Sequence, residues 1–313
     1  MQMQILTQDT TFKNFCKVNT KLGNEIKDVQ PSGPPLGQGS FGDVYDIGDD
    51  KVLKVFNQTC STNMKLREAA MIKLKPHKHI VKTFNCATFG DQDAIIQEKV
   101  VMLGNNGDLF DYVQSKSPNT RLEDAELKSF IVQLISGMNY LHINGYKHND
   151  LKLENILITT EGSEKILKIA DFGLSHHDDW SYTKRTHTPG NKQIIKFGSL
   201  QNKGGLYPYF GTESYLPSYD LVIDALAFKR DEWALGVMIY MLSYSSMLYR
   251  NFKDTLYGNP PRSRLFDVGP RKQFKYFANL FNIKPRGTES IMQLFISENP
   301  KTIIEVAKGL NIT

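Results

Sequence analysis

Residues 148–155 read HNDLKLEN, and Asp171-Phe172-Gly173 begins sixteen residues after Asn155. In the first stretch, Asp150 carries a carboxylate that could accept a proton from an attacking hydroxyl group. Lys152 stands two residues later and could neutralise charge on a phosphoryl group during transfer. The two residues are therefore candidates for proton transfer and for charge neutralisation.

Two further side chains of these stretches offer the hard oxygen ligands that Mg²⁺ prefers, namely Asn155 and Asp171. Either stretch alone is equally compatible with a polar loop and an ordinary Asp-Phe-Gly turn. The two together, after a glycine-rich loop and a strand lysine, favour a catalytic site because motif context decides such cases.

A glycine-rich segment lies upstream, at residues 36–44 (LGQGSFGDV). Glycines let the backbone approach phosphate oxygens, because no Cβ intervenes. A dinucleotide-binding loop would need a helix directly after the glycines, whereas residues 44–47 (VYDI) are typical of a strand. The segment therefore predicts a phosphate-binding hairpin with the pattern G-x-G-x-x-G-x-V, formed by Gly37, Gly39, Gly42 and Val44.

Lys54 lies in the next strand-like run, VLKVF at residues 52–56. Strand alternation places it on the same face as Val52 and Phe56, where a lysine could pair with nucleotide phosphates. Its expected partner is Glu68, on a helix predicted from Thr62 to Leu74 by apolar residues at helical spacing. A solvated lysine and a surface glutamate are the alternatives when each residue is taken alone.

The periodicity divides the chain into three parts, at residues 1–30, 31–104 and 105–313. The first is a polar extension, the second is mostly β-strand, and the third is mostly helical. An amphipathic helix is predicted over 124–141, and a helix buried on all sides over 232–243. The fold class is therefore α+β, with a small β-rich lobe before a larger, mainly helical lobe. Prolines at 31, 34 and 35 confine the first strand to a sheet edge.

Composition excludes several classes of protein. The chain has 313 residues, of which 40% are hydrophobic and 23% charged, and this excludes collagen, coiled coil and wholesale disorder. The cysteines Cys16, Cys60 and Cys86 form no C-x-x-C pair, so free thiols are expected rather than a zinc site or disulfides. There is no signal-peptide pattern, and the longest apolar run, 233–242, is too short to cross a bilayer. We expect a cytoplasmic or nuclear protein that is not secreted and has no membrane partner.

With these motifs in order, the chain resembles the eukaryotic-type Ser/Thr protein kinase superfamily. Two later segments extend the resemblance, Gly211-Thr212 and Asp231–Gly236 (DEWALG), so that it covers about residues 30 to 250. The resemblance implies a bilobal kinase fold, ATP as phosphoryl donor, Mg²⁺ or Mn²⁺ as cofactor, and protein substrates. The chain is also similar to divergent kinases of large DNA viruses, including baculovirus-like ones.

The resemblance implies a role for each matching residue. Asp150 would be the catalytic base, with Lys152, Asn155 and Thr212 as the other catalytic residues. Asn155 and Asp171 would hold the metal, and Asp231 would brace the catalytic loop, residues 148–155. The residues that it assigns to the nucleotide site are Gly37, Gly39, Gly42, Val44, Val52, Lys54, Glu68, Asp108 and Leu157.

Specificity is suggested by two pairs of residues. Lys152 and Thr212 resemble Ser/Thr rather than tyrosine kinases. Asp108 and Glu154 resemble acidic positions that recognise basic residues near the phosphorylated site. A helix N-cap for Asp108 and a surface charge for Glu154 are the alternatives.

Departures from the family pattern bear on regulation. Asn149 replaces the arginine that gathers a phosphorylated activation-loop residue, and an amide lacks the guanidinium fork. We therefore expect activity that does not require activation-loop phosphorylation. The activation segment, 171–218, is long, and its usual A-P-E end is degraded to Leu216-Pro217-Ser218. The gatekeeper and first hinge residue are either Gln97 and Glu98 or Val101 and Met102, of which the second pair has the more usual spacing to Asp108.

The formal charge of +5 is local. Residues 180–212 contain five basic residues and no Asp or Glu, so the other 33 basic and 33 acidic residues cancel. The segment is either a solvated loop or a docking site for an acidic partner or nucleic acid; its basic residues are Lys184, Arg185, Lys192, Lys196 and Lys203.

Three functions compete. An active Ser/Thr protein kinase is favoured, because every catalytic position holds a competent residue. A pseudokinase or scaffold is the first alternative, because of Asn149 and the degraded A-P-E end. A small-molecule kinase is the second, and Gly211-Thr212 with Asp231 argue against it.

Overall fold

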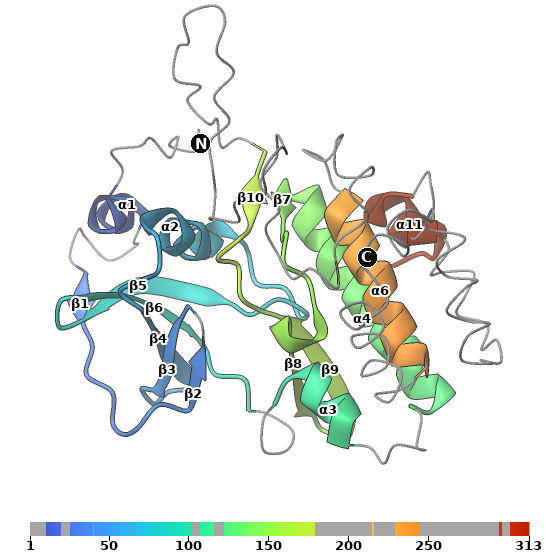
Figure 1. The fold of residues 1–313 in the computed structure, drawn as a ribbon, viewed down its shortest axis with the longest axis horizontal. Helices are drawn as coiled ribbons and strands as arrows, with labels where there is room; N and C mark the ends of the chain where they lie inside the picture. Colours follow the sequence, from blue (N-terminus) through green and yellow to red (C-terminus); the bar gives the residue numbers. More distant parts are fainter. Residues whose placement is uncertain are drawn as a thin grey trace, which may run out of the picture.

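The computed structural model of the protein describes residues 11–19, 26–39, 41–101, 107–115, 122–178, 215, 229–244, 294–295 and 301–312. These residues form a β-sheet lobe and a helical lobe, with small β-ribbons between them (Figure 1). The predicted α+β class and bilobal arrangement are confirmed.

The N-terminal lobe is built on a six-stranded sheet of order β1-β5-β6-β4-β3-β2. All neighbouring strands are antiparallel except β1 and β5. The strand β2 lies at the edge, as the prolines before it predict. The strands are β1 (Lys27–Asp28), β2 (Gly37–Gly39), β3 (Gly42–Asp46), β4 (Lys51–Phe56), β5 (Thr83–Phe89) and β6 (Gln92–Glu98).

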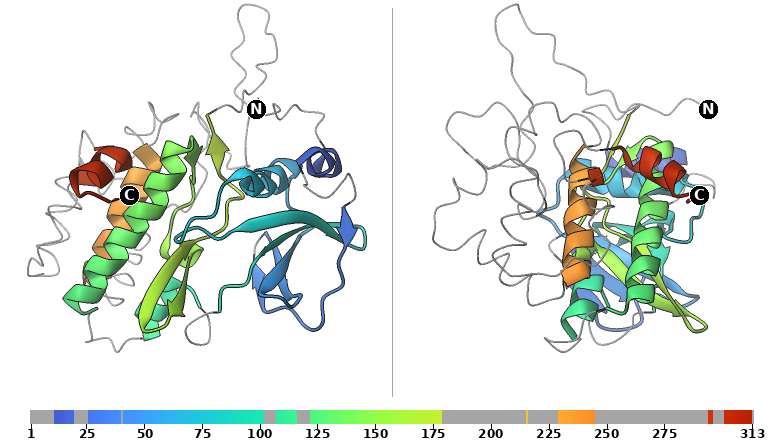
Figure 2. Two further views of the ribbon diagram at one scale, coloured as in Figure 1. Left: turned by 180° about the vertical axis from the view of Figure 1, so that it is seen from behind. Right: turned by 90° about the vertical axis from the view of Figure 1, so that its right-hand side faces the viewer.

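Two helices cover one face of this sheet, α1 (Phe12–Asn19) and α2 (Thr62–Ala70) (Figure 2). The predicted helix 62–74 is α2 followed by a 3-10 turn over Met71–Lys73. It begins where the Ser61 side chain accepts a hydrogen bond from the backbone of Met64. The helix α1 lies within the predicted extension and packs against α2. The ring of Phe12 contacts that of Phe56 of β4 edge-on, with the ring centroids 5.8 Å apart.

A disulfide joins Cys16 of α1 to Cys86 of β5, with the two Cα atoms 5.8 Å apart. The expectation of three free thiols was therefore wrong. The two cysteines are 70 residues apart in sequence, and only the docking of α1 beside the sheet brings them together. Cys60 is free and buried, and burial raises the pKa of its thiol to about 11.

The C-terminal lobe is centred on two long helices, α4 (Asp124–Ile143) and α6 (Lys229–Tyr244). It also contains the short helices α3 (Leu109–Ser115) and α11 (Ile303–Gly309). Both long helices were predicted from their apolar spacing. Every side chain of α6 from Arg230 to Ser243 is buried, as the apolar run predicts. No helix within the described ranges is both long enough and apolar enough to span a bilayer.

Two β-ribbons lie between the sheet and the long helices (Figures 1 and 2). One pairs β7 (Tyr146–Lys147) with β10 (His176–His177), and the other pairs β8 (Ile156–Glu161) with β9 (Glu164–Ile169). The segments that join these strands contain the HNDLKLEN stretch and the Asp-Phe-Gly tripeptide. The ribbons therefore hold both motifs where the two lobes meet.

Candidate active site

The strand lysine and the helix glutamate form a buried ion pair. Lys54 Nζ lies 2.7 Å from Glu68 Oε1 and 3.3 Å from Asp171 Oδ1, and the Lys54 and Glu68 residues are 8% and 1% exposed. On the opposite face of β4, Leu53 and Val55 pack with apolar side chains of β3, β5 and β6. Alternation along β4 therefore directs Lys54 toward α2.

The charge on Lys54 is stabilised by its partners. Burial alone would lower the pKa of the Lys54 ammonium, but the carboxylates of Glu68 and Asp171 outweigh burial and raise that pKa well above its ordinary value. Lys54 is thus a fixed cation between α2 and the Asp-Phe-Gly turn. This is the position from which a lysine can bind phosphate oxygens.

Two polar side chains of the catalytic loop converge on the carboxylate of a third residue, Asp150. Asp150 Oδ2 lies 3.3 Å from Lys152 Nζ, and Asn155 Nδ2 donates to Asp150 through its backbone oxygen at 2.7 Å and through Oδ2 at 3.3 Å. The 3-10 turn Leu153–Asn155 folds the loop back so that these groups meet. The structure thus brings Asp150, Lys152 and Asn155 together.

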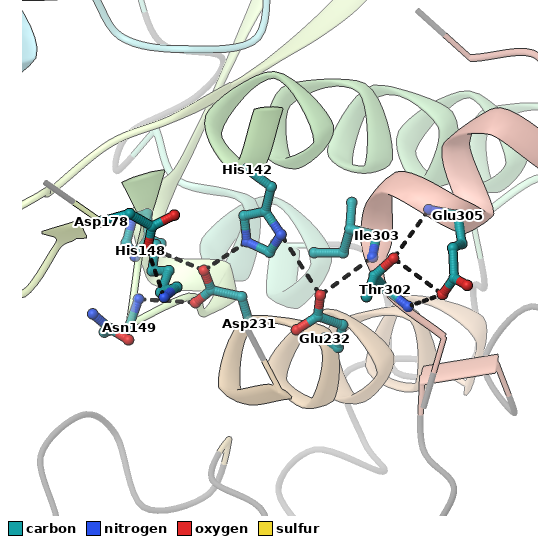
Figure 3. Close-up of polar contacts among 10 residues, drawn as sticks. His142, His148, Asn149, Asp178, Asp231, Glu232, Thr302, Ile303 and Glu305 are labelled. Carbon is teal, nitrogen blue, oxygen red and sulfur yellow. Dashed lines mark hydrogen bonds and ion pairs between the residues drawn. The ribbon is translucent and has the colours of Figure 1, made fainter. Parts of the chain in front are cut away.

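The catalytic loop is braced from α6 (Figure 3). Asp231 Oδ2 accepts a hydrogen bond from the backbone nitrogen of His148, and Oδ1 accepts one from that of Asn149, both at 2.8 Å. Asp231 is 1% exposed, and although burial opposes ionisation, hydrogen bonds and the charge of His142 lower the pKa of its carboxyl. A buried anion therefore fixes the two backbone groups that precede Asp150.

The loop is also attached to the Asp-Phe-Gly turn. His148 Nε2 lies 2.9 Å from the backbone oxygen of Ala170, and the ring of Phe172, fully buried, lies 5.1 Å from that of His148. Asp171 has φ of +61°, in the left-handed region. These contacts set the position of Asp171 relative to Asp150.

Asn149 adopts φ of +66°, a conformation that asparagine tolerates better than most residues. Its Nδ2 donates a hydrogen bond to the backbone oxygen of Leu174 at 3.1 Å. The amide thus holds the first residues after the Asp-Phe-Gly turn directly.

The glycines of the hairpin β2–β3 differ in what surrounds them. A Cβ at Gly42 would lie 2.3 Å from the backbone oxygen of Val55, so only glycine fits there. A Cβ at Gly37 would meet nothing within 4 Å, and at Gly39 only a backbone oxygen at 3.4 Å. The hairpin is therefore packed against β4 at Gly42, whereas the backbone at Gly37 and Gly39 has free space beside it. A backbone that binds phosphates needs such space.

The other residues that the resemblance assigns to the nucleotide site lie in β3, β4 and β8 and just before α3. Val44 pairs with Lys54 across the sheet, and Val52 is buried on the lysine's own face of β4. Leu157, in β8, forms a β-bridge with Asp108. The Asp108 carboxylate accepts a hydrogen bond from the backbone of Asp111 at 2.7 Å, as an N-cap of α3 would.

The two candidate gatekeeper residues differ in burial. Gln97 is 7% exposed, stands opposite Val52 in the sheet, and donates from Nε2 to the Thr83 hydroxyl at 3.2 Å. Val101 is 66% exposed. A gatekeeper lies at the back of the nucleotide site, so the structure favours Gln97 over Val101, against the spacing to Asp108.

The residues present fit a magnesium–nucleotide complex. Asn155 uses Nδ2 for both of its hydrogen bonds to Asp150, which leaves its amide oxygen as the hard ligand. The described ranges contain no cluster of three His, Cys, Asp or Glu side chains able to hold a metal on their own. A magnesium ion bound by Asn155 and Asp171 would take its other ligands from phosphates and water.

Sequence reasoning missed Tyr215, which is 2% exposed. Its hydroxyl accepts from the Leu153 backbone at 3.3 Å and donates to Glu154 Oε2 at 3.2 Å. The side chain of Glu154, within the HNDLKLEN stretch, is thus hydrogen-bonded to Tyr215. The only available signal was the nearness of Tyr215 to Gly211-Thr212 in the sequence.

Several predicted features lie outside the described residues: Met102, Gly211-Thr212, residues 216–218 and the five basic side chains of 180–212.

Residues 32–268 match the family model described as protein kinase domain. The chain therefore belongs to the protein kinase family, whose members generally use ATP and Mg²⁺.

Individual relatives are distant. The chain is 26% identical over 287 residues to CBL-interacting serine/threonine-protein kinase 8 of Arabidopsis thaliana, covering 88% of this chain and 55% of that protein. It is 31% identical over 218 residues to calcium-dependent protein kinase 4 of Plasmodium falciparum, covering 66% and 36%. It is 29% identical over 218 residues to Aurora kinase B of Drosophila melanogaster, covering 66% and 57%. The chain thus spans little more than half of these relatives, or less.

Proposed function

We propose that the chain is an active protein kinase that transfers the γ-phosphoryl group of ATP to serine and threonine hydroxyls. The observation that supports this most is the assembled set of charges: Lys54 bound to Glu68 and within 3.3 Å of Asp171, opposite an Asp150 that contacts Lys152 and Asn155. A scaffold that only binds partners has no need of this arrangement.

Each group has a task in the proposed reaction. Asp150 accepts the proton of the substrate hydroxyl, and Lys152 stabilises charge on the group in transfer. Lys54 binds phosphate oxygens, and Asn155 and Asp171 hold Mg²⁺ or Mn²⁺. The metal supplies neutralisation of the phosphate charge.

The test is ATP turnover against a degenerate peptide library, with Asp150→Asn as the matched variant. We expect phosphoserine and phosphothreonine products from the wild type and almost none from the variant. Nucleotide binding without turnover, unchanged by the substitution, would instead establish a pseudokinase. Phosphotyrosine as the main product would contradict the Ser/Thr proposal, which rests on Lys152 and the names of the relatives.

We further propose that activity does not depend on phosphorylation of the activation segment. The hydrogen bond from Asn149 to the Leu174 backbone supports this, because it attaches the start of the segment without a phosphate. Phosphatase treatment should leave kcat within about twofold. Asn149→Asp keeps a residue that tolerates positive φ but removes the donor, so it should lower kcat. A large loss of rate on phosphatase treatment contradicts the proposal.

The peptide library also tests the partner predictions. Selection of basic residues near the phosphorylated position would support recognition by Asp108 and Glu154, although both carboxylates already have hydrogen-bond partners within the protein. Docking of an acidic partner or nucleic acid at residues 180–212, a location in the cytoplasm or nucleus, and the viral sub-family stay predictions.

A further inference from the structure

A second carboxylate is buried beside the brace of the catalytic loop. Glu232 follows Asp231 on α6 and is 2% exposed. Its Oε1 accepts a hydrogen bond from the backbone nitrogen of Ile303, the first residue of α11, at 3.2 Å (Figure 3). Its Oε2 has no hydrogen-bond partner among the described residues. Buried carboxylates are costly, so this one calls for an explanation.

His142 of α4 lies between the two carboxylates (Figure 3). Its Nε2 is 3.0 Å from Asp231 Oδ2, and its Nδ1 is 3.6 Å from Glu232 Oε1. Since Asp231 holds the catalytic loop, the contacts form a continuous path from α11 through Glu232, His142 and Asp231 to the backbone before Asp150.

The surroundings of Glu232 favour its neutral form. Burial, and next the charge of Asp231, raise the pKa of the Glu232 carboxyl to about 8. Lys147 of β7 acts weakly in the opposite direction. The charged groups on α11 are exposed, and α11 offers Glu232 a backbone N–H. The titratable side chains that act on Glu232 or contact it are Asp231, Lys147 and His142, and the buried Arg230 precedes Asp231 on α6.

We propose that Glu232 is a positioning residue for the catalytic loop, which acts through the His142 ring on Asp231. At neutral pH Glu232 is protonated and uncharged, so Asp231 is the only ionised carboxylate of the pair and accepts the hydrogen bond from the Nε2–H of His142. When that proton is lost, two ionised carboxylates compete for the single N–H of a neutral imidazole. Asp231 then loses its donor, and its hold on the backbone of His148 and Asn149 weakens.

The inference rests on the proposed kinase function, and the pH dependence of kcat tests it. Wild-type kcat should fall by about tenfold per pH unit above about pH 8, since a single proton is lost. Glu232→Gln keeps an acceptor for Ile303 and never becomes charged. Its kcat should lie within about twofold of wild type at pH 7 and stay level to pH 9. KM for ATP should be unchanged, because Lys54 is not affected.

Two control variants separate positioning from general loosening. Glu305→Ala breaks the capping box that Glu305 forms with Thr302 at the start of α11 (Figure 3), away from Glu232. It should keep the wild-type pH profile. His142→Gln retains a donor at the place of Nε2 but has no group at the place of Nδ1. Adding Glu232→Gln to His142→Gln should therefore have no further effect on kcat.

Amide hydrogen exchange supplies a readout that does not need turnover. In the wild type, protection of the His148 and Asn149 amides, corrected for the intrinsic exchange rate, should fall at least tenfold between pH 7 and pH 9. In Glu232→Gln it should not. The proposal is overturned if both proteins show the same protection at pH 9, if the alkaline loss persists in Glu232→Gln, or if Glu305→Ala removes it equally. Absence of kinase activity with the expected exchange result would count against the proposed function alone.

Discussion

The disulfide between Cys16 and Cys86 should contribute measurably to stability, and Cys16→Ser or chemical reduction removes it. The bond closes a loop of 70 residues that includes β1 to β4 and α2. In the chain-entropy model, a loop of that length restricts the unfolded chain by about 4 kcal/mol at 25 °C. The eight-residue helix α1 should detach as well, because a helix so short is not stable without tertiary contacts.

The assay is urea unfolding followed by far-UV circular dichroism, with and without reductant. We expect the free energy of unfolding of the oxidised wild type to exceed that of the reduced protein, and of Cys16→Ser, by about 4 kcal/mol. The control is Cys60→Ser, which removes a buried free thiol and should remain sensitive to reductant. Three titratable thiols in the oxidised, denatured protein, or equal midpoints with and without reductant, would refute the reasoning.

Three further predictions concern the site. Asp150→Asn should lower kcat by about a hundred- to ten-thousandfold with KM for ATP little changed, since a general base is removed while the nucleotide site is untouched; this is measured by steady-state kinetics. Lys54→Met should lower kcat/KM for ATP by about ten- to a hundredfold, because a charge-assisted hydrogen bond to phosphate is lost, whereas Lys51→Met on the same strand should have no effect. Glu232→Gln should change the dependence of stability on pH. Folding raises the pKa of Glu232 from 4.5 to about 8, so the stabilisation that the wild type gains from protonated Glu232 is complete below pH 4.5 and is lost as pH rises through 8. The variant should gain on the wild type by up to about 5 kcal/mol above pH 8, measured by urea unfolding at several pH values; parallel curves would contradict this.

Much of the fold and site followed from local patterns. The period of two in residues 52–56 placed Lys54 on the face toward α2, because successive strand side chains alternate. The period of 3.6 identified α4, and the apolar run identified the fully buried α6. The proximity of Asp150, Lys152 and Asn155 was predictable because they lie within six residues of one loop.

Other features depend on contacts that no local pattern records. The disulfide requires α1 to dock beside β5, and the spacing of the cysteines gives no sign of it. Glu232 is an ordinary helix-start residue in sequence, and only the packing of α4 and α11 around it makes it a buried carboxylate. The sequence left the gatekeeper open between Gln97 and Val101, because the exposure of Val101 is a property of the folded lobe.

The hydrogen bonds from the catalytic loop to Asp231 have a consequence for folding during synthesis on the ribosome. Asp231 follows His148 and Asn149 by 83 and 82 residues. A nascent chain that has emerged only as far as Asp171 already contains the glycine loop, Lys54, Glu68 and the whole HNDLKLEN stretch, yet it lacks the carboxylate that binds the backbone nitrogens of His148 and Asn149. Domains fold as units during synthesis, so enzymatic competence should arise late and abruptly, when α6 has been made and buried, rather than growing as each motif appears.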